Sequence, residues 1–206
     1  MDLAQGPIGQ SIYAASKVWL AVLPAIWLFL VERARPRFAW PKWRGVKIGA
    51  ILGLVISAVI VLGYATAGKN LIDVDHFREL AKENGFGSIG RYLGFCTYIV
   101  LINALLEEYV WRWFVVRQWQ AVTSAALHGW VSIVLAAACF TAHHVVALAL
   151  QFELPVVIIG SAGVFVGGIA WSWCYVRYAS IWPGYVSHAI VDVAVFAVGW
   201  HLLFVN

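Results

Sequence analysis

The chain has 206 residues, of which 63% are hydrophobic and only 12% are charged, whereas about 25% of the residues in a typical soluble domain are charged. This composition excludes an ordinary soluble domain and indicates an integral membrane protein with the lipid bilayer as a partner. The formal net charge of +4 comes mainly from residues 32–47, which hold six Lys or Arg and one Glu. We interpret this charge as a topology signal and expect no nucleic-acid partner.

Six apolar segments, each long enough to cross a bilayer as a helix, follow one another along the chain. We place them at about 11–31, 46–66, 92–116, 128–150, 155–177 and 182–204. The predicted fold is therefore all-α, a polytopic transmembrane helix bundle of about six spans. We treat residues 1–206 as a single membrane-embedded domain, in which 1–66 supply two peripheral spans and 92–206 carry the motifs described below.

The connections between the spans carry further signals. Within the polar stretch 67–91, apolar residues at helical spacing predict a short interfacial or extramembrane helix that is ended by Gly85 and Gly87. Residues 118–127 fit either a short re-entrant segment or an extension of a neighbouring helix. The basic loop 32–47 is expected in the cytoplasm, with both termini on the opposite side. Tryptophans near the span ends, among which we count Trp171, are interpreted as an aromatic belt.

Seven carboxylate, guanidinium or imidazole side chains lie well inside the third, fourth and sixth predicted spans, where burial in hydrocarbon costs several kcal/mol. Such residues normally face the interior of a bundle and mark a reaction, relay or transport site. They come from the third, fourth and sixth spans: Glu107, Glu108, Arg112, His143, His144, His188 and Asp192.

The spacing divides the charges of the third span into two groups. Glu108 and Arg112 are four residues apart, so they share a helix face in the favourable acid-first order. Glu107 is rotated by about 100° from Glu108, and we expect it to have no partner on its own helix. One carboxylate is then paired and the other is free for chemistry. His188 and Asp192 have the same spacing, so the acid can orient the imidazole.

Structural roles compete with functional ones for some of these residues. Intramembrane charges usually pair, so the Glu108–Arg112 pair alone fits a structural role. A single intramembrane histidine can equally serve as an interhelical hydrogen-bonding group. Of the two adjacent histidines only one can face a given site, and we assign His143 a structural role. Three helices that together supply acids, imidazoles and a cation favour a functional site.

A free carboxylate beside an imidazole can hold a water, take its proton and return that proton to a leaving amine. A second imidazole can stabilise the oxyanion of the tetrahedral intermediate. This chemistry is that of a peptidase without a Ser or Cys nucleophile. A metal site is the main alternative, because Glu, His and Asp all bind zinc or iron. The HExxH arrangement is absent, however, and we expect no metal and no other cofactor.

Three motifs on successive spans resemble those of the CPBP family, also called the ABI family, which includes CAAX-processing proteases and bacteriocin-processing or immunity proteins. The motifs are GluGluxxxArg (Glu107, Glu108, Arg112), PhexxxHis (Phe140, His144) and HisxxxAsp (His188, Asp192), and the resemblance covers about residues 92–206.

The resemblance implies an intramembrane glutamic endopeptidase. In that case Glu107 is the general base, His144 is its partner on the water, and His188 with Asp192 forms the oxyanion side. Glu108 and Arg112 form the supporting pair, and Phe140 lies beside His144. The chain departs from the family pattern in three ways. Trp113 follows the Arg where relatives often carry Gly, position 192 is Asp rather than Asn, and six spans are fewer than the eight of the eukaryotic CAAX endopeptidases.

We therefore expect a membrane protease of the bacterial cytoplasmic membrane that cleaves a membrane protein or peptide. Two other functions remain open at this point. One is a catalytically silent immunity or binding protein of the same family. The other is a proton-linked transporter or channel, although no inverted repeat or broken-helix pair supports it.

Overall fold

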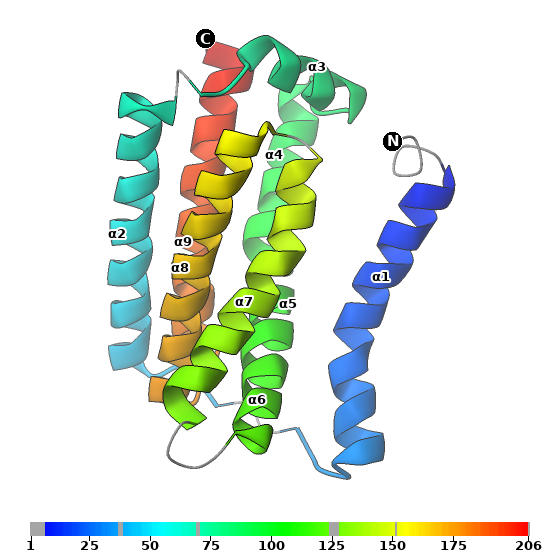
Figure 1. The fold of residues 1–206 in the computed structure, drawn as a ribbon, viewed down its shortest axis with the longest axis vertical. Coiled ribbons are helices and arrows are strands. Elements are labelled where there is room, and N and C mark those ends of the chain that lie inside the picture. The colour runs from blue at the N-terminus through cyan, green and yellow to red at the C-terminus, as the bar shows by residue number, and fades with distance from the viewer. Residues whose placement is uncertain (1–6, 37–38, 69–70, 124–127, 151, 206) are drawn as a thin grey trace. The chain divides into compact units, whose positions relative to one another are not determined.

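The computed structural model describes residues 7–36, 39–68, 71–123, 128–150 and 152–205, and in those residues it contains helices and no strand (Figure 1). The all-α prediction is confirmed. The chain separates into two compact units, residues 1–38 and 39–206. In the first unit, helix α1 (Pro7–Ile26) continues as a π-helical turn, Trp27–Val31.

The second unit is a bundle of long helices. It contains α2 (Trp43–Thr66), α7 (His128–Ala149), α8 (Leu154–Tyr178) and α9 (Trp182–Trp200), the last of which continues as a π-helical turn, His201–Val205. The third span is helical throughout but changes type along its length. It consists of α4 (Ile89–Tyr98), a π-helical segment (Ile99–Asn103), α5 (Ala104–Glu107), a second π-helical segment (Glu108–Val116) and α6 (Arg117–Val122).

Among the described residues of the second unit, five helices are long and apolar enough to cross a bilayer. They span Trp43–Thr66, Ile89–Val122, Gly129–Ala149, Leu154–Tyr178 and Trp182–Val205. These helices correspond to the second to sixth predicted spans. The first predicted span, 11–31, falls in α1 and its π-helical turn, in which Val18–Val31 forms a shorter apolar helix. The protein is an integral, multi-pass membrane protein.

The connections follow the sequence signals. The predicted short helix is α3 (Val74–Glu83), and it begins where the side chain of Asp73 accepts a hydrogen bond from the backbone N–H of His76 at 3.0 Å. It ends just before Gly85, whose φ of +83° places it in the left-handed region. Residues 118–122 extend the third span as α6 rather than re-entering the membrane, and residues 124–127 lie outside the described part.

A glycine face brings α2 directly onto α9, the helix that carries His188. Gly45, Gly49 and Gly53 recur every fourth residue and are buried. A Cβ atom at Gly49 would collide with the carbonyl group of Pro183, and one at Gly53 would lie 2.9 Å from the carbonyl oxygen of Ser187. Small residues of this kind allow two membrane helices to approach closely. Helix α2, which carries none of the three motifs, therefore packs closely against α9, the helix that carries His188.

Candidate active site

The two adjacent carboxylates lie where the third span changes from an α-helix to a π-helix. Glu107 is the last residue of α5, and Glu108 begins the π-helical segment Glu108–Val116. A π-helix closes its backbone hydrogen bonds over five residues instead of four and is frequent at functional sites. The regular α-helical geometry that we assumed for this span is therefore wrong over Ile99–Asn103 and Glu108–Val116, although the predicted ion pair is retained.

Glu108 and Arg112 form a fully buried ion pair. Arg112 Nη1 lies 3.1 Å from Glu108 Oε1, and both side chains are 0% exposed. The guanidinium carbon of Arg112 lies 4.4 Å from the ring centre of Phe140 and 5.0 Å from that of Trp171. The buried cation thus contacts one carboxylate and two aromatic faces.

The same carboxylate also orients His188. His188 Nδ1 lies 3.1 Å from Glu108 Oε1. Because an ionised carboxylate only accepts hydrogen bonds, the Nδ1–H donates to it and Nε2 faces the opposite way. We expected Asp192 to orient this imidazole, but Asp192 Oδ1 lies 3.7 Å from Nε2, beyond hydrogen-bond distance. The orienting acid is therefore Glu108, which comes from a different helix.

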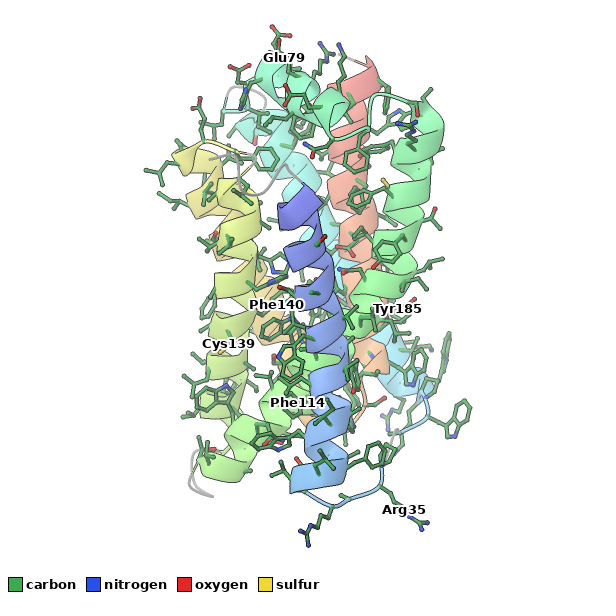
Figure 2. The ribbon with its side chains drawn as sticks, turned by 90° about the vertical axis from the view of Figure 1, so that its right-hand side faces the viewer. Arg35, Glu79, Phe114, Cys139, Phe140 and Tyr185 are labelled. Atoms are coloured by element: carbon green, nitrogen blue, oxygen red, sulfur yellow. The ribbon has the colours of Figure 1, made fainter. Side chains whose placement is uncertain are left out.

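His144 is oriented by its own helix. Its Nδ1 lies 3.0 Å from the carbonyl oxygen of Phe140, which can only accept, so Nδ1–H donates and Nε2 faces away. The Phe140 ring, which is 1% exposed, lies 4.3 Å from the imidazole ring and forms the expected wall beside it. Figure 2 shows Phe140 between the helices of the bundle, and its neighbour Cys139 is only partly buried.

Glu107 lies at the point where the two imidazoles converge. Its Oε2 is 4.0 Å from His144 Nε2 and 3.7 Å from His188 Nε2. Helices α5, α7 and α9 therefore bring together Glu107, His144 and His188, three of the four residues predicted to be catalytic. His143 lies to one side, with its ring 5.9 Å from that of Trp111 and 5.2 Å from that of His144.

Glu107 does have a partner on its own helix, contrary to our expectation. The side-chain amide of Asn103 donates to Glu107 Oε1 at 2.9 Å. Asn103 is four residues before Glu107 and is the polar residue of an apolar stretch, so the spacing rule used for Glu108 and Arg112 could have identified it. Sequence reasoning also missed Trp171, which is 4% exposed and lies inside the bundle rather than in the aromatic belt.

Trp113, where relatives often carry Gly, is accommodated beside the site. It is 4% exposed, stacks on Tyr109 with ring centres 5.2 Å apart, and has the guanidinium carbon of Arg117 5.0 Å from its ring centre. These contacts lie along the third span toward α6. Among the residues that the structure describes, no group of three or more His, Cys, Asp or Glu side chains is arranged to hold a metal ion.

Residues 90–194 match the model of the type II CAAX prenyl endopeptidase Rce1-like family. The chain belongs to this family. The match covers half of the chain and contains all three motifs, which confirms the resemblance seen in the sequence. Searches of the curated proteins and of the solved structures each returned no match. Membership of the family indicates a membrane-embedded endopeptidase with a membrane-associated substrate.

Proposed function

We propose that the protein is an intramembrane glutamic endopeptidase in which Glu107 and His144 activate a water molecule. The observation that carries this proposal is the position of Glu107 Oε2, which faces the Nε2 atoms of His144 and His188 at 4.0 and 3.7 Å. Polar atoms at such separations are too far apart to bond directly and suit a bridging water.

In this mechanism the water donates one hydrogen to Glu107 Oε2 and the other to His144 Nε2. Nδ1–H of His144 is engaged by the Phe140 carbonyl, so Nε2 of the neutral ring is free to accept. The lone pairs of the water oxygen then point at the scissile carbonyl carbon. As the new C–O bond forms, the water proton passes to Glu107, and it is delivered to the amide nitrogen when the C–N bond breaks.

The oxyanion of the tetrahedral intermediate is assigned to the side of His188. With Nδ1–H held by Glu108 Oε1 at 3.1 Å, the imidazolium form of His188 presents its Nε2–H to the developing charge. Asp192, whose Oδ1 lies 3.7 Å from the same nitrogen, is one turn further along α9 and donates to the oxyanion when it is protonated. Glu108 and Arg112 act as the supporting pair.

We also propose that the protein lies in the bacterial cytoplasmic membrane. The basic loop 32–47 is then on the cytoplasmic side, because loops rich in Lys and Arg are retained there. The substrate class is a membrane-associated protein or peptide. A substrate of this class fits a member of a family of CAAX prenyl endopeptidases.

The test is cleavage by the purified full chain in liposomes. Glu107→Gln and His144→Ala should each lower kcat by about 10²–10⁴-fold, the usual contribution of a general base, while the variants still insert and unfold cooperatively. Glu79→Gln, at an exposed position on α3 that Figure 2 labels, is the matched control and should retain full activity. Full activity in either site variant contradicts the proposal. Partner binding that survives both substitutions, without proteolysis, would instead indicate a silent immunity or binding protein.

A further inference from the structure

Helix α8 places one large side chain in the middle of the site. Trp171 packs face to face with His188, with ring centres 4.0 Å apart and ring planes inclined by only 15°. Both side chains are buried, at 4% exposure each. The indole therefore covers one face of the imidazole that we assign to the oxyanion.

The indole is itself held on several sides. Its Nε1–H donates to Ser187 Oγ at 2.9 Å, and Ser187 is fully buried. The ring of Phe140 meets it edge to face, with centres 5.9 Å apart, and the guanidinium carbon of Arg112 lies 5.0 Å from its centre. The indole ring is therefore held in one orientation, because its nitrogen is hydrogen-bonded and its ring contacts an aromatic and a cationic group.

The hydrogen bond to Glu108 does not by itself determine where His188 Nε2 points. A single bond at Nδ1 restrains one end of the imidazole and leaves the ring plane free to tilt about that contact. A parallel indole removes this freedom, because tilting the imidazole would drive it into the indole face or open a void between the rings. Glu108 therefore determines the tautomer, and Trp171 determines the plane.

We propose that Trp171 is a positioning residue for His188 that holds the imidazole plane so that Nε2 faces Glu107 and Asp192. This inference rests on the proposed function, since it concerns the geometry of the oxyanion side. Trp171 acts on the transition state, in which the Nε2–H of His188 must lie within hydrogen-bond distance of the developing oxyanion. A misplaced catalytic group can cost about 10²-fold in rate.

Kinetics of three variants of the full chain in liposomes test the proposal. Trp171→Leu, which removes the planar face, should lower kcat by about 10²-fold and leave KM within about threefold of the native value, as expected for an interaction made only in the transition state. Trp171→Phe keeps a face without the N–H and should recover activity to within about tenfold of native. Trp173→Leu, two residues further along the same helix, is the control and should match native kinetics.

The proposal is overturned if Trp171→Leu retains native kcat, or if the phenylalanine variant folds and is as slow as the leucine variant, which would show that no planar face is required. If Trp171→Leu does not fold, the ring stack is tested by NMR spectroscopy of the native protein. The histidines are isotopically labelled, and the His188 signal is assigned because it disappears in His188→Asn. In the native protein the His188 ring protons should resonate upfield of their position in Trp171→Phe, because the indole is a larger ring than phenyl. Equal resonance positions overturn the stack. Native activity in Glu107→Gln would remove the proposed function itself, whereas an inactive Glu107→Gln beside a fully active Trp171→Leu removes only this inference.

Discussion

Asn103 and Glu107 lie one turn apart on the third span, and the side-chain amide of Asn103 donates to Glu107 Oε1 at 2.9 Å. Both residues are buried, at 9% and 8% exposure. The bond engages one carboxylate oxygen and leaves Oε2 facing the imidazoles of His144 and His188. The carboxylate that we assign as the general base is thus aimed by a neighbour on its own helix.

Replacing Asn103 by Leu should lower kcat about ten- to a hundredfold. A hydrogen bond to a charged group is worth about 1.5–3 kcal/mol, and its loss leaves the Glu107 carboxylate free to rotate away from the imidazoles. Single-turnover cleavage in liposomes measures the effect. The control is Thr97→Val, which should cleave at the native rate. Thr97 is exposed on the same span, and among the contacts described its hydroxyl bonds only to the carbonyl of Leu93 on its own helix. A native rate in Asn103→Leu would refute the positioning role.

The Glu108–Arg112 pair predicts a non-additive stability pattern. Arg112→Leu leaves a buried carboxylate without its cation and should lower the free energy of unfolding by about 3 kcal/mol. This value is at the lower end of the range for a broken buried ion pair, because His188 still donates a hydrogen bond to Glu108. The double variant Glu108→Leu/Arg112→Leu removes both charges and should recover most of that loss. Denaturant unfolding in mixed micelles measures both values.

The double variant should nevertheless remain inactive, because the Nδ1–H of His188 loses its acceptor. The double variant should therefore regain stability without regaining activity. A double variant that is no more stable than Arg112→Leu, or one that regains activity, would contradict the pairing described here.

The sequence was sufficient for the second to sixth spans and for α3, because these depend on local periodicity, and the three motifs were recognised from the resemblance to a known family. Arg112 was paired correctly with Glu108 since both lie on one helix. The partner of His188 was not predictable in the same way. Its Nδ1 contact with Glu108 joins residues 80 positions apart, and only the packing of α9 against the third span determines it. Trp171 was misassigned because a tryptophan near a span end is typical both of an aromatic belt and of an interior site.

The glycine face of α2 gives a matched pair of substitutions. Gly49→Ala places a Cβ atom against the backbone carbonyl of Pro183, which cannot rotate away, so the variant should lose about 1–3 kcal/mol of stability. Activity should fall as well, because the next residue, Gly184, lies so close to Glu108 that a Cβ atom there would collide with the carboxylate. Gly63→Ala, on the same helix with nothing within 4 Å of the added atom, is the control and should leave both stability and activity at native values. Equal behaviour of the two variants would show that α2 does not pack closely on α9.

Chelation decides between the water mechanism and a metal-dependent one. Glu107, His144, His188 and Asp192 are all residue types that bind zinc, but among the described residues no three such side chains are arranged around a common ion position. Glu107 Oε1 is in addition engaged by Asn103. Cleavage should therefore be unchanged after prolonged dialysis against EDTA and 1,10-phenanthroline, and added zinc should not increase kcat. Metal analysis of the active, dialysed protein should give well under one equivalent of zinc per chain. Activity that disappears on chelation and returns with stoichiometric zinc would replace the glutamate-activated water by a metal-bound one.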